Sequence, residues 1–395
     1  MNTLARFSRQ TVMIAWLLAF LLGSHVAAAS GSEPLQLKEE SGTPARVPSS
    51  LDSLVAVALD ENPRVEAARA SHGAALARVP RAGALPDPML MAAADGAPVK
   101  NPSPAEAEMG RFTLTQMLPF PGKLGLMRKG MAHEAEAAGS RAARVRLEVA
   151  YEVHSAYYDL HLIHESIGVL ERSVASLETL LPVVRDRYRT GLATQADLLR
   201  VRVELADQQT NLSTLRLSIQ AAEARLNAAL GRPPGSALAR PSLPDTVLPS
   251  IAIPEIDQAV LDRQPMLKVE RSMEEKARAD LALARREGLP DFTLGIEYMN
   301  RRDMDDAWTG MFGLTLPIWR WNKVGPQRRE AEARLMAAAA ERRRVLNESI
   351  SLAREAYAMA ITSRDRVRVY EKEILPDAEM ALASSLASYP TGEMR

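Results

Sequence analysis

The sequence predicts a mainly α-helical fold with a small β part, organised as two tandem repeats. Three observations lead to this fold class: an unbroken heptad pattern, short segments in which apolar and polar residues alternate, and motifs that occur twice in the same order. The heptads indicate long antiparallel helical hairpins packed side by side. The alternating segments indicate short strands with one apolar face.

Five short motifs in the first half of the chain recur in the second half, with offsets of 198 to 204 residues. Because their order is preserved, we interpret them as a structural repeat rather than as chance similarity. The matched segments are 59–63 with 261–265, 85–87 with 289–291, 118–120 with 316–318, 156–157 with 356–357, and 188–191 with 389–392.

The repeats define the organisation of the chain. Each is predicted to contain a helix (51–80 and 255–287), then two strands and a very long helix, and the first repeat has a further long helix. Six prolines mark the connector between the repeats. We therefore divide the chain into a signal peptide at 1–29, a flexible segment at 30–50, repeat one at 51–231, a Pro-rich connector at 232–254 and repeat two at 255–395.

The second repeat stops soon after its last shared motif. Repeat one continues for about forty residues beyond Gly191, whereas three residues follow Gly392. Repeat symmetry therefore predicts that the last long helix is missing and that the chain is a truncated form. Sequencing past the codon for Arg395 would test this expectation.

The N-terminus predicts secretion. Arg6 and Arg9 precede an apolar run at 12–22, and the alanines at 27–29 offer a small-residue cleavage site. The run is too short to span a bilayer as a helix, so we prefer a cleaved signal peptide to a retained anchor. Cleavage lowers Lys+Arg from 49 to 47 against 49 Asp+Glu, and the resulting net charge of −2 argues against a nucleic-acid partner. The chain contains no cysteine and therefore no disulfide.

The clearest helix signal lies at 198–229. Residues spaced alternately three and four apart form a heptad seam there, with Gln208 as its single polar member. We expect one helix from Ala196 to Leu230 and another long helix over 128–181. The seam consists of Leu198, Val201, Leu205, Gln208, Leu212, Leu215, Ile219, Ala222, Leu226 and Ala229.

Two segments of repeat two, 291–299 and 308–318, alternate apolar with small or polar residues. Weaker alternation marks the matching segments 85–94 and 111–118, where Gln116 falls on the apolar side. The pattern is typical of outer-membrane strands with apolar side chains toward lipid, although any one segment also fits an edge strand in a soluble sandwich. The predicted lipid-facing residues are Phe292, Leu294, Ile296, Tyr298, Trp308, Phe312, Leu314 and Leu316.

Four strands are too few to close a barrel by themselves. An open sheet edge in lipid would leave backbone N–H and C=O groups unpaired, at a cost of several kcal/mol each. We therefore expect each protomer to contribute its four strands to a transmembrane β-barrel shared between identical copies. The long helices would extend off this barrel, and their heptads require side-by-side packing. The strand count does not choose between three copies and four.

Several motifs occur together across 51–395: Leu-Pro-Asp before a strand, Gln-x-x-Pro-Phe-Pro-Gly-Lys at 116–123, and the paired Tyr-x-x-Gly turns. With the signal peptide and the two repeats, they make the chain resemble the TolC family of outer-membrane efflux proteins. The Pro-Phe-Pro-Gly-Lys stretch most resembles the heavy-metal branch, the CzcC and CusC type. The resemblance implies a passive outer-membrane exit duct of a tripartite efflux or export system, with heavy-metal cations as candidate cargo.

The resemblance also implies an assembly and its partners. These are a homotrimer with a twelve-stranded barrel in outer-membrane lipid and a long helical barrel (α-barrel) crossing the periplasm, a periplasmic adaptor, and an inner-membrane pump of the RND type. The Tyr-x-x-Gly turns would sit at the periplasmic helix tips, where the adaptor docks and the channel opens. A plain helix terminator explains Gly191 equally well, and Asp197 either caps a helix or joins a salt-bridge network. The residues that match the tips are Tyr188, Gly191, Asp197, Tyr389 and Gly392.

Other chemistry is weakly indicated. His154, His161 and His164 fall on one helical face, and imidazole binds zinc or copper, but exposed histidines on a long helix explain them equally well. The methionines are more often packing residues than copper ligands. Because no catalytic or phosphate-binding motif is found, we expect neither an enzyme nor a cofactor. The alternative function is a periplasmic coiled-coil adaptor that never enters the membrane.

Overall fold

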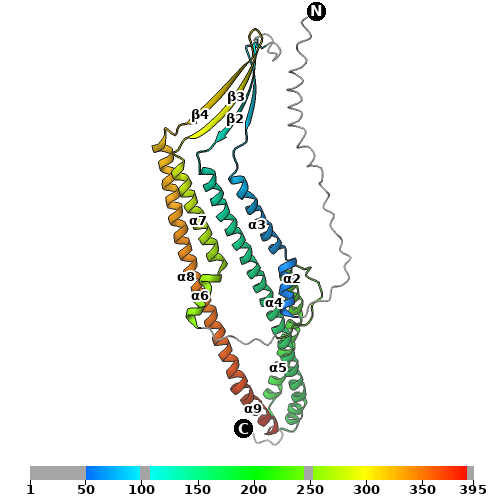
Figure 1. The fold of residues 1–395 in the computed structure, drawn as a ribbon. Coiled ribbons are helices and arrows are strands. Elements are labelled where there is room, and N and C mark those ends of the chain that lie inside the picture. Colours follow the sequence, from blue (N-terminus) through cyan, green and yellow to red (C-terminus); the bar gives the residue numbers. More distant parts are fainter. Residues whose placement is uncertain (1–49, 98–106, 244–251, 389–395) are drawn as a thin grey trace, which may run out of the picture. The chain divides into compact units, whose positions relative to one another are not determined.

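The computed structural model describes residues 50–97, 107–243 and 252–388 (Figure 1). The predicted signal peptide at 1–29, and all but the last residue of the flexible segment at 30–50, lie outside the described residues. Helices dominate the described ranges, and four strands form one antiparallel sheet. The predicted mainly α-helical class with a small β part is therefore confirmed.

Each half of the chain begins with a pair of helices where the sequence predicted one helix, so the continuous helices expected at 51–80 and 255–287 were wrong. The breaks fall at Asn62 and Gln264, each followed by a proline. Proline cannot donate the next helical hydrogen bond and forces extended backbone on the preceding residue; ψ is 122° at Asn62 and 114° at Gln264. The pairs are α2 (Leu51–Glu61) with α3 (Pro63–Ala82), and α6 (Ile253–Arg263) with α7 (Pro265–Arg286).

Two long helices, α4 (Lys123–Arg189) and α5 (Gln195–Leu230), pack against each other. The helix expected from Ala196 to Leu230 is confirmed to within one residue. Every member of its heptad seam is buried or half-buried, as the pattern predicted. The helix expected over 128–181 is longer than predicted at both ends. It continues through Pro182 because neighbouring helices pack along α4, and this packing offsets the roughly 3 kcal/mol that a proline costs inside a helix.

The break at Asn62 is held against the end of α5. The Asn62 Oδ1 accepts the N–H of Arg64 at 2.8 Å, which caps α3, and the Asn62 Nδ2 donates to the carbonyl of Ala229 at 2.8 Å. Gly231, with φ 77°, ends α5 here, and a Cβ on it would lie 2.8 Å from the Asn62 Cα. Both the conformation and this close approach require glycine.

The sheet has the strand order β1-β2-β3-β4, so β1 and β4 are its edges. The predicted strand at 308–318 ends early, at Thr315, because Pro317 cannot donate to a ladder. Leu316, predicted to face lipid as part of that strand, therefore lies just beyond it. The strands are β1 (Met89–Asp95), β2 (Met109–Leu118), β3 (Asp291–Arg301) and β4 (Ala307–Thr315).

The second half continues from β4 into helices that run on from one another. The π-helical turn η2 (Arg320–Val324) leads into α8 (Gly325–Val369), and a second π-helical turn, η3 (Tyr370–Ile374), leads into α9 (Leu375–Ser388). α8 packs against α7. The order helix, helix, strand, strand, long helix thus occurs in both halves of the chain.

The main apolar core lies where α2, α4 and α5 meet. A smaller cluster joins α7 to α8. Within residues 50–97, 107–243 and 252–388, none of the helices combines the length and the apolar composition needed to cross a membrane. The largest fully buried core side chains are Leu160, Leu226, Leu230, Val149, Val153, Val184 and Val269.

Tyr157 tests how the connector is held to this core. Its hydroxyl donates to the Ser242 carbonyl at 2.7 Å and accepts the Ser242 N–H at 2.9 Å. Tyr157→Phe should therefore lower the free energy of unfolding by about 1–3 kcal/mol, because a buried tyrosine loses both bonds. Tyr151→Phe is the matched control, since that side chain is 73 % exposed. Equal losses for the two variants in chemical denaturation would contradict this assignment.

Candidate functional site

One face of the four-stranded sheet is apolar and uncovered. Residues paired across neighbouring strands share a face, and the register places seven of the eight predicted lipid-facing residues, all but Leu316, on the same face. Phe312 is 70 % exposed and Trp308 is 68 % exposed. The cross-strand pairs on this face include Phe292 with Leu314, Leu294 with Phe312 and Tyr298 with Trp308.

β1 and β2 extend the same apolar face. Leu114 lies opposite Ile296, and Leu90 lies opposite Leu114. Gln116, opposite Leu294, is the exception that the sequence already showed. Its Nε2 donates to the Pro86 carbonyl at 2.7 Å, which satisfies the polar group locally.

The opposite face of the sheet carries charged and hydroxyl side chains among methionines and small residues. Thr113 donates its hydroxyl hydrogen to Glu297 at 2.9 Å across β2 and β3, and both residues lie on this face. Arg111 donates to Asp95 at 3.1 Å from β2 to β1. The sheet therefore has one side suited to lipid and another suited to water, as expected for a strand set at a channel wall.

Lys123 joins the sheet to the helices and one half of the chain to the other. Its side chain is buried, and its Nζ donates to the Leu289 carbonyl at 3.2 Å and to Asp291 Oδ1 at 2.9 Å. The same Asp291 oxygen accepts the N–H of Phe120 at 2.7 Å. A buried ammonium needs such partners, so this cluster fixes the start of α4 against the start of β3.

Neither Lys123 nor Asp291 was predicted as a site residue. The sequence did mark both residues, because Lys123 belongs to the Pro-Phe-Pro-Gly-Lys motif and Asp291 to the Leu-Pro-Asp motif. No spacing rule, however, shows that these two motifs meet in the fold. Gly122, with φ 88°, lies beside them, and a Cβ there would be 1.8 Å from Nη1 of Arg286. The positive φ favours glycine here, whereas the guanidinium is the end of a flexible side chain that could move aside.

A tight turn at 190–194 joins α4 to α5. Gly191 has φ 74°, and the N–H groups of Leu192 and Ala193 both donate to the Arg187 carbonyl, at 2.8 and 3.2 Å. These bonds satisfy acceptor groups that the end of a helix leaves free. The expectation that Gly191 ends one helix before the next begins is confirmed.

Thr194 and Asp197 begin α5 with a capping box. The Asp197 carboxylate accepts the Thr194 N–H at 2.9 Å, and the Thr194 Oγ1 accepts the Asp197 N–H at 3.2 Å. Hydrogen bonds from the Thr194 side chain and backbone lower the pKa of Asp197. Its contribution to the turn is therefore present above the pKa of an unfolded aspartate and is lost as pH falls through the lowered folded value. Of the two roles expected for Asp197, this geometry shows helix capping, with Thr194 as the N-cap residue itself.

Of the other predicted tip residues, Tyr188 borders this turn, and its carbonyl accepts the Gly191 N–H at 3.2 Å. Tyr188 lies on the last turn of α4 with a side chain that is 42 % exposed. Tyr389 and Gly392 lie outside the described residues. The docking and gating roles assigned to all five tip residues stay predictions.

The three histidines predicted as a metal site all lie on α4 and have ordinary surroundings. His161 Nδ1 lies 3.3 Å from the Pro241 carbonyl of the connector. Burial, and then the nearby charge of Arg240, lowers the pKa of His164 and favours its neutral form. His154 lies beside a tyrosine ring. In the part of the chain that the structure describes, no group of three His, Cys, Asp or Glu side chains is arranged to hold a metal ion.

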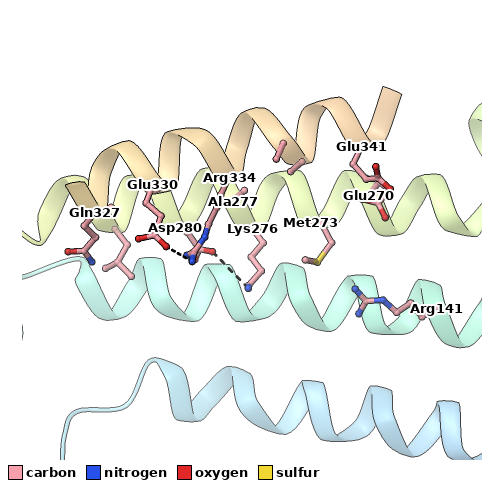
Figure 2. Close-up of a pocket in the computed structure, with 15 residues that line it drawn as sticks. Arg141, Glu270, Met273, Lys276, Ala277, Asp280, Gln327, Glu330, Arg334 and Glu341 are labelled. Atoms are coloured by element: carbon pink, nitrogen blue, oxygen red, sulfur yellow. Dashed lines mark ion pairs between the residues drawn. The ribbon is translucent and has the colours of Figure 1, made fainter. Parts of the chain in front are cut away.

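A groove runs between α4, α7 and α8, and its walls carry charges of both signs (Figure 2). Glu330 and Arg334 pair at 2.5 Å on α8, and Lys276 and Asp280 approach within 3.9 Å on α7. Burial and the neighbouring Glu341 carboxylate raise the pKa of Glu270. Because opposite charges pair inside the groove, it offers no field that would select one kind of ion.

The comparison with known families decides what this architecture belongs to. Residues 54–232 and 257–393 match the family described as outer membrane efflux protein. The chain belongs to this family. The resemblance to the TolC-type efflux proteins is therefore confirmed, and both the family and the fold are those of channel proteins rather than enzymes.

Relatives within the outer membrane efflux protein family are distant. The chain is 24 % identical over 291 residues to the cobalt-zinc-cadmium resistance protein CzcC of Cupriavidus metallidurans, covering 71 % of this chain and 68 % of that protein. It is 25 % identical over 224 residues to the pyoverdine export outer membrane protein OpmQ of Pseudomonas putida, covering 54 % and 47 %. The first match supports the heavy-metal branch, while the second spans less than half of its relative.

Solved structures show the same fold. CusC superposes with a TM-score of 0.74 at 16 % identity, covering 92 % of this chain and 88 % of that one. The outer membrane protein VceC from Vibrio cholerae superposes with a TM-score of 0.70 at 21 % identity, covering 87 % of each chain. At these identities the likeness establishes the architecture of an efflux-family channel and leaves its cargo open.

Gly191→Ala tests the turn between α4 and α5. A Cβ at Gly191 meets no atom within 4 Å, so the cost is that of a left-handed backbone alone, about 1–2 kcal/mol. Gly73→Ala is the matched control, because Gly73 lies in open space inside α3 and alanine there should stabilise the helix by about 0.5–1 kcal/mol. The free energy of unfolding, measured by chemical denaturation and by hydrogen exchange at 190–194, should fall in Gly191→Ala and rise in Gly73→Ala. A change of the same sign in both variants would refute the assignment.

Proposed function

We propose that the chain is the outer-membrane channel of a tripartite efflux system and acts as a homotrimer. Three copies of the four-stranded sheet would close a twelve-stranded barrel in the outer membrane, and the long helices would form the periplasmic part of the duct. The chain would supply a passive exit path, while an inner-membrane pump supplies the energy. The repeated order of elements supports two tandem repeats as the basis of this assembly.

The observation that carries the proposal is the open sheet with an uncovered apolar face. Two edge strands, β1 and β4, offer unpaired backbone groups, and the apolar face exposes Phe312 and Trp308 to solvent in a single chain. Lipid would cover the face, and a neighbouring copy would pair the edges. A barrel shared between copies resolves both costs at once, whereas a water-exposed adaptor resolves neither.

The exposed turn at 190–194 supports contact with a periplasmic adaptor. Its backbone is held by Gly191 and by the Thr194–Asp197 capping box, and Tyr188 beside it is exposed. A well-ordered turn with exposed side chains suits a docking site, because little ordering remains to oppose binding. We assign Tyr188, Gly191 and Asp197 to adaptor docking and opening of the duct, with Tyr389 and Gly392 as their counterparts in the second half.

Heavy-metal cations are the proposed cargo, driven by a pump of the RND type. The relation to CzcC supports this choice, whereas the relation to OpmQ points to a different cargo. The face of the sheet opposite the apolar one carries Glu297 and Thr113 among methionines, so it would present oxygen and thioether groups to a passing cation.

Adjacent residues of β4 lie on opposite faces of the sheet, so a charge placed at each of them tests the two faces separately. Phe312→Lys would place a charge toward lipid near the middle of the strand, at a cost of about 2–4 kcal/mol per copy. Met311→Lys would place the same charge on the polar face, where water solvates it. We expect the first variant to lose the heat-modifiable trimer from outer-membrane fractions and the second to retain it. Equal tolerance of both, or recovery of the unchanged chain in the soluble periplasm, would end the channel proposal and favour the adaptor.

Cargo can be tested in the host cell. Deleting the gene should raise the cellular content of cobalt, zinc or cadmium, measured by mass spectrometry during exposure to these ions. Supplying the unchanged chain should bring the metal content back to its original level. The Phe312→Lys variant serves as the assembly-defective control. Unchanged metal content together with retention of an organic compound would show that the duct serves another cargo.

A further inference from the structure

We infer that β4 of one copy pairs with β1 of the next in one defined register, held by Asp87 of the second copy against Ile318 and Lys323 of the first. The inference rests on the proposed shared barrel and adds the register and a side-chain contact that the barrel alone does not specify. Its basis is a junction that exists inside a single chain.

That junction holds β2 and β3 together where the sheet meets the helices. Asp291 ends a Leu-Pro-Asp motif in front of β3, and it binds two groups that follow the Leu-Pro motif after β2. These are the Phe120 N–H at 2.7 Å and the Lys123 Nζ at 2.9 Å. The carboxylate at the start of β3 therefore holds the chain segment that leaves its antiparallel neighbour β2.

The two edge strands carry the same pair of motifs without a partner. Leu85-Pro86-Asp87 precedes β1, while Leu316-Pro317-Ile318 follows β4 and leads to Lys323 in η2. Asp87 and Lys323 are exposed, and neither forms an ion pair within the described ranges. The Ile318 N–H donates to the Leu316 carbonyl at 2.9 Å, in a short local turn that a carboxylate could replace.

The ladders inside the chain follow the motif correspondence residue by residue. Asp291 lies opposite Thr315. Asp87 and Met117 correspond to these residues, with offsets of 204 and 198, as 291 − 87 and 315 − 117 show. Met89 lies opposite Thr115, so two further residues along the same antiparallel ladder Asp87 comes opposite Met117. The β1–β2 and β3–β4 ladders therefore have equivalent registers.

The β2–β3 ladder then predicts the register of the ladder between β4 of one copy and β1 of the next. Met117 lies opposite Thr293 in the β2–β3 ladder. The same two offsets convert this pair into Thr315 opposite Met89 of the next copy, since 117 + 198 is 315 and 293 − 204 is 89. Leu314 would then face Leu90.

This register keeps each face of the sheet continuous from one copy to the next. Leu314 and Leu90 both belong to the apolar face, and Phe312 would lie opposite Ala92 on that face as well. A slip of one residue would move apolar side chains of one strand beside polar ones of the other, because side chains alternate along a strand. At the base of the pair, Asp87 would reach the Ile318 N–H as Asp291 reaches the Phe120 N–H. Lys323, two residues beyond the position that the offset of 198 assigns to Lys123, would supply the ammonium group.

Cysteine pairs test the register, because the chain has no cysteine of its own. Met89→Cys with Thr315→Cys should form a disulfide between copies in outer-membrane preparations, since directly opposed residues have the Cα spacing that disulfides need. Met117→Cys with Thr293→Cys is the positive control, which should close inside one chain. Met91→Cys with Thr315→Cys is displaced by two residues on the same face and should give no disulfide-linked oligomer on a non-reducing gel of samples heated enough to dissociate the non-covalent oligomer.

Charge exchange tests the contact at Asp87. Asp87→Lys should cause loss of the SDS-resistant oligomer at temperatures where the unchanged chain keeps it, because two ammonium groups would meet. Asp87→Lys combined with Lys323→Asp should restore it. Failure of the exchange to restore the oligomer, with the monomer still folded by circular dichroism, would overturn this contact.

The outcomes separate the inference from the function on which it rests. Absence of any SDS-resistant oligomer from the unchanged chain would reject the shared barrel and this register with it. An oligomer in which the displaced cysteine pair cross-links, while the predicted pair does not, would reject the register and leave the barrel standing.

Discussion

The pairing of Lys123 with Asp291 is the interaction on which the arrangement of this chain depends. It lies where the sheet meets the helices, and it joins residues of the two halves that are 168 positions apart in sequence. A buried ammonium is stable only with its partners in place, so the start of α4 and the start of β3 cannot shift independently. Gly122 precedes α4 in a left-handed conformation, with φ 88°, that favours glycine.

The faces and edges of the sheet extend from that junction. Once β2 and β3 are locked in register, alternation along each strand places Phe292, Leu294 and Ile296 on one side and Thr293 and Glu297 on the other. Among the described residues, the apolar side is uncovered and the outer edges are unpaired. Efflux-family membership and this open sheet support the proposed assembly with further copies in lipid.

The helices show how far local pattern reaches. The heptad seam of α5 was predictable because each apolar residue faces α4 at a fixed spacing, and all of its members are buried or half-buried. The breaks at Asn62 and Gln264 were missed, although the prolines that cause them are in the sequence. A proline is also favourable at the first position of a helix, so the residue alone does not distinguish a break from a continuation; Pro182 inside α4 shows the opposite outcome.

The sequence by itself determined the secondary structure class, the apolar face of the strands and the glycine turn at 190–194, because each depends on neighbours a few residues apart. Tertiary structure alone decided that Lys123 meets Asp291, that Asn62 binds the end of α5, and that β2 lies beside β3. These contacts join distant segments, and no periodicity records which of many possible partners a buried polar group will find. The physical reason is that spacing encodes local geometry, whereas burial and hydrogen bonding are settled only when the segments pack together.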